Sequence, residues 1–163
     1  MKGLKLSLIA VGLFIICGCS GLRPVVYTGS ASLNGYKYAY VTPTSGIVSG
    51  SGEVYDNQSG VYGSATSRSI NPADIISGIM MKNGYILVPE ISDEIKDRTL
   101  IVNYAETGRR DVYLIWDAVE ITVQVVSADT YELLCTCTAE RLGDDADDVR
   151  NAIARAMEKM FQN

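Results

Sequence analysis

The sequence predicts an α+β domain in which a mixed sheet of about five strands carries two helices. Three groups of residues support this fold class. Residues 36–88 contain a strand, a helix and a second strand in succession, residues 112–140 form two alternating stretches joined by a turn, and residues 143–162 have the spacing of an amphipathic helix. The first group predicts a βαβ unit with parallel strands, and the second predicts an antiparallel hairpin.

Alternating tyrosines mark the first strand, which we expect over residues 36–42. Tyr36, Tyr38 and Tyr40 occupy every second position, and successive side chains of a strand point to opposite faces. All three tyrosines are therefore expected on one face of the sheet. They either simply cover that face or, because tyrosine joins apolar area to a polar tip, form a surface for a partner or a glycan.

A Gly- and Ser-rich excursion follows over residues 44–69. Two short strands are expected within it, at 53–55 and 61–62, on either side of a turn. A connection of this length is uncommon inside a compact domain. We therefore expect a flexible excursion with one weak hairpin. The excursion contributes two further tyrosines to the candidate partner surface. That surface comprises Tyr36, Tyr38, Tyr40, Tyr55 and Tyr62.

The helix over residues 72–83 has the clearest start in the chain. Asn71 is a favourable N-cap, and Pro72 suits the first helical position because its missing N–H has no helical partner there. Gly84 can adopt the left-handed conformation that ends many helices. The strand at 85–88 follows at once, which completes the βαβ unit.

The second half of the domain is expected to be mostly antiparallel. A strand over 99–104 leads into a turn at 106–110, around Gly108, and a long strand over 112–126 follows. A strand over 131–140 then returns beside it, and the closing helix follows. This arrangement places one hairpin and one helix after the βαβ unit.

The first eighteen residues have the pattern of a secretory signal peptide. Lys2 and Lys5 form a short basic region, and residues 6–16 form an apolar run. That run is too short for a transmembrane helix, which needs roughly 20 apolar residues. Its end resembles the lipobox of bacterial lipoproteins, with Ile16 and Gly18 before Cys19; the cysteine at position 17 is the departure from that pattern.

The lipobox resemblance implies cleavage after Gly18 and a lipid on Cys19. Several acyl chains on one cysteine make a firm membrane anchor. In such lipoproteins a serine after the cysteine, here Ser20, implies the outer membrane. Residues 19–33 are then expected to be a lipid anchor and tether, and residues 34–163 a single domain. The alternative is an ordinary secreted protein.

Composition excludes several classes of function. Removing residues 1–18 takes away Lys2 and Lys5, which leaves 12 basic and 19 acidic residues and a formal charge of −7. So acidic a domain is a poor candidate for binding nucleic acid. The chain has no histidine, which excludes histidine-based catalytic triads and zinc sites. We expect no catalytic residue, metal or cofactor.

Two cysteines and two carboxylates remain as candidates for chemistry. Cys135 and Cys137 point to one face of a strand, where a disulfide would be strained, so we expect two small buried side chains. Asp117 and Glu120 form a carboxylate pair that suits glycoside hydrolysis if the two face each other. Solvated surface charge is the favoured explanation for such carboxylates, with Asp117 as the exception because apolar residues flank it in the strand.

The order of elements resembles the TolB-like amino-terminal fold, which recurs in small envelope lipoproteins such as the penicillin-binding-protein activator and curli-export lipoproteins. The resemblance is carried by residues 82–88, residues 125–134 and the closing helix. Composition and lipobox are also similar to lipoproteins of Bacteroidetes-type bacteria. The resemblance implies an adaptor-like role, although fold alone does not determine function.

Three functions are consistent with these features. The first is a non-enzymatic, lipid-anchored module that binds an envelope protein. The second is a glycan-acting enzyme, or a domain that binds glycans. The third is a subunit of a self-assembling envelope structure that uses an exposed sheet edge.

Overall fold

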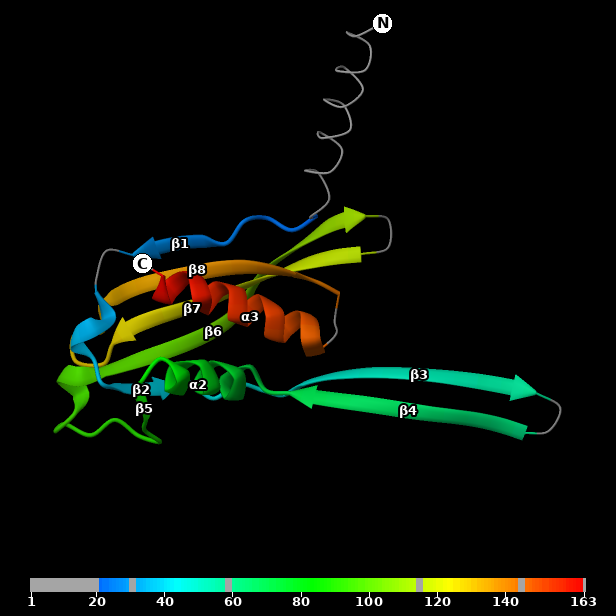
Figure 1. The fold of residues 1–163 in the computed structure, drawn as a ribbon, viewed down its shortest axis with the longest axis horizontal. Coiled ribbons are helices and arrows are strands. Elements are labelled where there is room, and N and C mark those ends of the chain that lie inside the picture. Colours follow the sequence, from blue (N-terminus) through cyan, green and yellow to red (C-terminus); the bar gives the residue numbers. More distant parts are fainter. Residues whose placement is uncertain (1–20, 30–31, 58–59, 114–115, 144–145, 163) are drawn as a thin grey trace, which may run out of the picture.

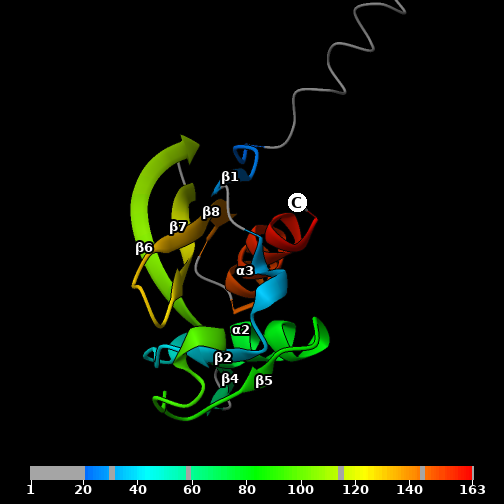
Figure 2. The same cartoon turned by 90° about the vertical axis from the view of Figure 1, so that its left-hand side faces the viewer.

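The computed structural model describes residues 21–29, 32–57, 60–113, 116–143 and 146–162. It confirms the α+β class: a six-stranded mixed sheet carries two helices on one of its faces (Figures 1 and 2). The strand order is β1-β8-β7-β6-β2-β5, and β3 and β4 form a separate two-stranded sheet. No helix among the described residues is long and apolar enough to cross a membrane. The strands are Val26–Gly29 (β1), Tyr38–Val41 (β2), Ile47–Asn57 (β3), Gly60–Ile70 (β4), Ile86–Leu87 (β5), Thr99–Tyr113 (β6), Trp116–Ser127 (β7) and Leu133–Leu142 (β8).

The predicted βαβ unit is confirmed. Strands β2 and β5 are parallel neighbours, and α2 (Pro72–Lys82) connects them in the chain. Asn71 caps the helix as expected, because its Oδ1 accepts a hydrogen bond of 3.0 Å from the N–H of Ala73. Gly84 follows the helix with a φ of +88°, a conformation that favours glycine.

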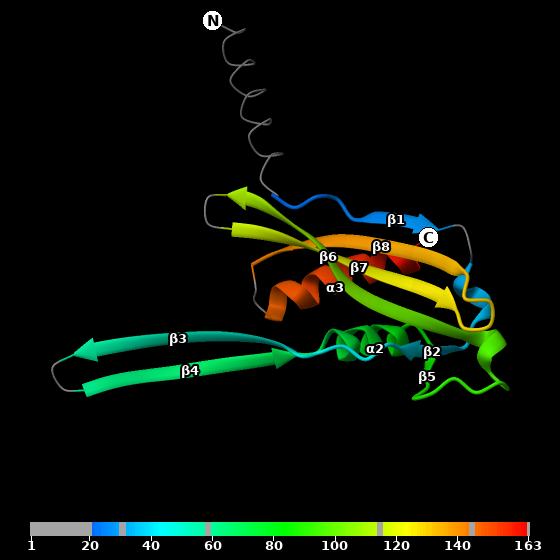
Figure 3. The same ribbon diagram turned by 180° about the vertical axis from the view of Figure 1, so that it is seen from behind.

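The predicted turn around Gly108 is wrong. Strand β6 runs without a break from Thr99 to Tyr113, and the register with β7 shifts between Glu106 and Gly108. Such a shift is a β-bulge, in which one extra residue bends a strand without ending it. The chain therefore reverses later, between Tyr113 and Trp116, and the β6–β7 hairpin is much longer than expected (Figure 3).

The N-terminal part of the domain also differs from the expected tether. Strand β1 pairs with β8, with Tyr27 opposite Cys137 and Gly29 opposite Cys135. A Cβ atom on Gly29 would lie 2.6 Å from the Cβ of Cys135, so only glycine allows this close approach. Residues 26–29 are thus an edge strand of the sheet, and the folded domain begins before residue 34.

The 44–69 excursion forms a single long hairpin, which we call the β3–β4 arm. Its strands pair in antiparallel register from Ile47 opposite Ile70 to Asn57 opposite Gly60. The predicted hairpin is therefore present, and each strand is 11 residues long. The arm extends away from the main sheet along the long axis of the molecule (Figure 1).

The core lies between the main sheet and the closing helix, α3 (Ala146–Phe161). Ile121, Val123 and Val125 point from β7 into this layer and are fully buried, as their alternation predicted. One face of α3 meets them with an apolar stripe of helical spacing. The buried residues of that stripe are Ala146, Val149, Ala152, Ile153, Ala156, Met157 and Met160.

Candidate anchor clamp and partner surface

The residues that carry the lipidation hypothesis, Gly18 and Cys19, lie outside the described residues. The described chain starts at Gly21, two positions after Cys19. From there the segment 21–25 runs along the sheet into β1 (Figure 1). The structure thus shows how the chain just after the candidate anchor is attached to the domain.

Arg110 on β6 and Glu140 on β8 hold this segment in place. Nε and Nη2 of Arg110 each donate a hydrogen bond of 2.7 Å to the carboxylate of Glu140. The same Nη2 donates to the carbonyl oxygen of Gly21 at 2.7 Å, and Glu140 Oε2 accepts from the backbone N–H of Arg23 at 2.6 Å. Two-point pairing of this kind fixes geometry as well as charge.

Arg155 adds a contact from the helix layer. Its Nη1 donates to the carbonyl oxygen of Glu140 at 3.0 Å, and its Nη2 donates to that of Arg23 at 3.4 Å. We call Arg110, Glu140 and Arg155 the anchor clamp. Because the clamp joins β6, β8 and α3 to the segment after Cys19, that segment belongs to the folded domain.

Glu140 is the centre of the clamp, with only 4% of its side chain exposed. The hydrogen bonds from Arg110 lower the pKa of this carboxyl; burial opposes the shift, and the backbone N–H of Arg23 and the charges of both arginines support it. A carboxyl whose pKa is lowered stays ionised at neutral pH and is unsuited to be the general acid of a glycosidase.

A second ion pair lies on the other face of β8. Arg141, only 3% exposed, donates from Nη2 to Glu106 Oε1 at 3.1 Å. Its Nη1 donates to the carbonyl oxygen of Gly143. Glu140 and Arg141 are consecutive, so their side chains leave the strand on opposite faces and each contacts β6.

One face of the main sheet is not covered by any helix of the described residues. On it, four apolar side chains from adjacent strands form a straight row, which we call the apolar row. The register places Tyr40 beside Ile101, Ile101 beside Val126, and Val126 beside Leu133. Leu133 is 52% exposed, and the other three are partly exposed. The row is uncharged, although the protein is acidic.

On one side of the apolar row the same face is polar, with neutral residues in the two rows that follow. Asn103, Gln124 and Thr136 lie side by side on β6, β7 and β8, and Thr42 donates to Asn103 Oδ1 at 2.6 Å. The next row includes Thr122 and Thr138, whose hydroxyls are 3.1 Å apart. These internal hydrogen bonds satisfy polar groups of the face without a partner.

The five tyrosines of the candidate partner surface fall in three places. Tyr38 and Tyr40 lie on the uncovered face, on either side of the buried Ala39. Tyr38 is flanked by cations, with Lys37 Nζ 5.8 Å and the Arg98 guanidinium carbon 5.9 Å from its ring centroid. Tyr36 precedes β2 and packs against the core. Tyr55 and Tyr62 are opposite each other on the arm.

The two cysteines are free and buried, which confirms the expectation of small core side chains. Both point from β8 into the layer beneath α3. Burial raises the pKa of Cys135 to about 11. It also raises the pKa of Cys137 to about 12, with a smaller contribution from Cys135. Thiols held neutral in this way are poor nucleophiles.

The carboxylate pair of the enzyme hypothesis lies on β7. Asp117 is exposed on β7, and Glu120 accepts a hydrogen bond of 2.7 Å from Thr107. No group of His, Cys, Asp and Glu residues in the described ranges is arranged to hold a metal ion.

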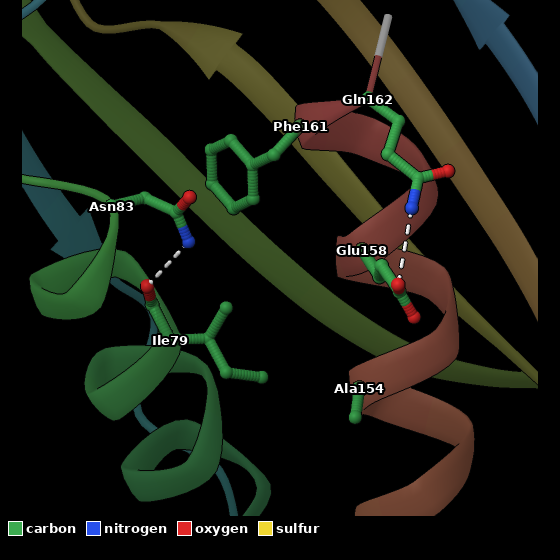
Figure 4. A pocket seen from close by; sticks show the side chains of 6 residues that line it. All are labelled: Ile79, Asn83, Ala154, Glu158, Phe161 and Gln162. Atoms are coloured by element: carbon green, nitrogen blue, oxygen red, sulfur yellow. Dashed lines mark hydrogen bonds between the residues drawn. The ribbon is translucent and has the colours of Figure 1, made fainter.

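A shallow groove of about 310 Å³ lies between the C-terminal ends of α2 and α3 (Figure 4). Ile79 and Phe161 line it from the two helices. Its amides bond within their own helices: Asn83 Nδ2 donates to the carbonyl of Ile79 at 2.9 Å, and Gln162 Nε2 donates to Glu158 Oε1 at 3.0 Å. The groove therefore offers few polar groups to a ligand.

Comparison with known proteins identifies no family. No protein-family model matches the chain, and no curated protein matches it. Similar solved structures include two of PelC dodecamers from Paraburkholderia phytofirmans, one of them a point variant. The variant shares 15% identity over 82% of this chain and 92% of its own, with a TM-score of 0.45. The other structure shares 14% sequence identity over 82% of this chain and 94% of its own chain, with a TM-score of 0.44. Similarity at this level carries no information on function.

Sequence patterns did not predict the anchor clamp. Arg110 and Glu140 are 30 positions apart, and Gly21 is 89 positions from Arg110. The local signal is Glu140 itself, a charged residue that follows the neutral run from Leu133 to Ala139. That signal does not name a partner, because the partner depends on which strands become neighbours.

The clamp predicts a specific dependence of stability on pH. Because its folded-state pKa lies below the ordinary value near 4.5, Glu140 stabilises the fold fully above that value. This contribution is lost as the pH falls through the lower, folded-state pKa. The free energy of unfolding, measured by urea titration, should therefore fall more steeply with acid in the wild type than in Glu140→Gln. Glu132→Gln, on an exposed turn, should keep the wild-type slope; equal slopes in all three would contradict the role of Glu140.

Burial of the thiols predicts that Cys135 and Cys137 resist alkylation in the folded protein at pH 8. Both should react only after unfolding, as mapped by mass spectrometry of the labelled peptides. Thr136→Cys is a matched control, because residue 136 lies between them on the uncovered face and should be labelled at once. Native labelling of either core cysteine as fast as this control would refute their burial.

Proposed function

We propose that this protein is a non-enzymatic binding module, anchored by a lipid on Cys19 in the outer membrane, that docks a protein of the cell envelope. The observation that carries the proposal is the uncovered face of the sheet with its apolar row. An ordered, uncharged apolar surface on an acidic domain is typical of a protein-binding site.

The anchor clamp supports the membrane part of the proposal. If Cys19 carries the lipid, only Ser20 separates it from the segment that Arg110 and Glu140 hold. The domain is then fixed close to the bilayer in one orientation, without a long flexible tether. A fixed orientation presents the same surface to a partner at all times, which lowers the entropic cost of docking.

The chemistry of the uncovered face supports a partner with an apolar surface. On one side the apolar row is bordered by the neutral side chains of Asn103, Gln124 and Thr136, so a partner gains by burying apolar area there. A protein with a neutral apolar patch fits this surface.

Lipidation can be tested directly by metabolic labelling with palmitate. The wild type should incorporate the label and Cys19→Ala should not, because the resemblance to lipoproteins places the thioether on that cysteine. Cys17→Ala is the matched control and should be labelled like the wild type. Label that persists in Cys19→Ala, or is absent from all three proteins, would overturn the anchor.

The partner surface can be tested by crosslinking and co-purification from the native envelope. Replacing Ile101 and Val126 by threonine removes apolar area from the centre of the row while keeping β-propensity. This double variant should lose the partner that the wild type retains. Gln124→Thr changes a neighbouring residue outside the row and should retain it.

Two results would argue against this surface. A partner held equally by the double variant and the wild type would place the binding site elsewhere. Retention of a glycan rather than a protein, with the same dependence on Ile101 and Val126, would favour the alternative function of glycan binding.

A further inference from the structure

The β3–β4 arm starts from a firmly held base. Ile47 and Ile70, its first paired residues, both pack against the hydrophobic core. Just outside them, the hydroxyl of Thr44 donates to Asn71 Oδ1, and both oxygens accept from the N–H of Ala73 at 3.0 Å. The two ends of the arm are thus tied together at the start of α2.

Beyond this base the arm leaves the core. Each of its strands has 11 residues, a length of about 35 Å for an extended chain. The strands pair with each other and with no further strand of the described chain. Both outer edges of the arm therefore have unpaired backbone N–H and C=O groups. A two-stranded hairpin alone is at best marginally stable in water, so the arm gains from additional pairing.

The arm lacks the features that keep exposed strand edges apart. Proteins commonly protect such edges with lysine or proline, or with dense charge. Residues 48–69 contain no lysine and no proline, and their charged residues are Glu53, Asp56 and Arg68. Most of the remaining residues are Gly, Ser, Thr, Val and Tyr. Two identical edges of this composition can therefore approach each other with little repulsion.

We propose that the arm pairs edge to edge with the arm of a second copy of this chain. Such pairing gives a four-stranded ribbon and a twofold interface in which the same surface is used by both copies. The composition favours a second copy of this chain as the binding partner. The arm of that copy has strand edges of the same length, and they are equally unprotected.

The position of the arm agrees with pairing on a membrane. Figures 1 and 2 show the arm on the opposite side of the body from β1 and the segment that precedes it. Two copies anchored through Cys19 have the same orientation relative to the bilayer, so their arms lie at the same height. A twofold axis normal to the membrane then brings arm against arm. This last step rests on the proposed lipid anchor, whereas edge-to-edge pairing itself does not.

The test is capture of one tagged copy by another. Two full-length forms with different tags are co-expressed, the membranes are solubilised in mild detergent, and one tag is used to capture the other. The wild type should capture its second copy. Replacing residues 48–69 by a two-residue Asn-Gly turn should abolish capture, because Ile47 and Ile70 face each other and can be joined directly.

A second variant keeps the full length of the arm. The double variant Ser51→Lys with Glu53→Lys places lysines on the arm of each copy. The lysines of the two copies repel each other across the interface, so this variant should also abolish capture. Ser51→Thr with Glu53→Gln is the matched control and should retain it. Thermal unfolding followed by circular dichroism checks that the body folds in every variant, since none of them alters the core.

Several outcomes would overturn the proposal. One is a wild type that fails to capture its second copy, and another is capture that does not depend on the arm. A third is arm-dependent capture of a different protein in place of the second copy. Capture that depends on the arm and persists in Cys19→Ala would support the pairing even if palmitate labelling failed, so the two proposals can fail separately.

Discussion

The structure depends on the burial of one face of a sheet by two helices. Ile121, Val123 and Val125 on β7 and the cysteines on β8 present one continuous apolar surface, and α3 covers it with a matching stripe. The described chain has two α-helices for the six strands of the main sheet, and both pack on the same side. The opposite face must therefore be stable in contact with water, and its ordered hydroxyl and amide groups meet that requirement.

Two ion pairs hold the part of the β6–β7 hairpin that lies beyond β2. Strand β6 continues past the end of its partner β2, so much of it has a neighbour on one side only. Glu140 and Arg141 contact it from opposite faces of β8, through Arg110 and Glu106. Because desolvation offsets much of the attraction in such ion pairs, we expect them to fix the arrangement of the strands more than to add stability. In this protein the arrangement includes the segment that follows Cys19.

Local sequence rules succeeded where a few adjacent residues decide the structure. The cap at Asn71, the glycine after α2, the alternation of β7 and the stripe of α3 were all predictable, because each depends on contacts within one or two turns or strands. The predicted turn around Gly108 failed, because a glycine in a strand can mark either a turn or a bulge. Pairing with β7 on both sides of the bulge, which is a tertiary effect, keeps the strand continuous there. Strand β1 was missed because its pairing with β8 joins residues more than a hundred positions apart.

The sequence by itself determined the α+β class, the order of the helices and most strands, and the identity of the buried apolar stripes. It also supplied the signal and lipobox pattern from which the anchor hypothesis comes. The tertiary structure alone decided that Tyr40 lies beside Ile101 and Val126, that Tyr36 turns to the core, and that Arg110 meets Glu140 and Gly21. The physical reason is that periodicity fixes the face on which a side chain lies, whereas its neighbours on that face depend on which strands pair and in which register.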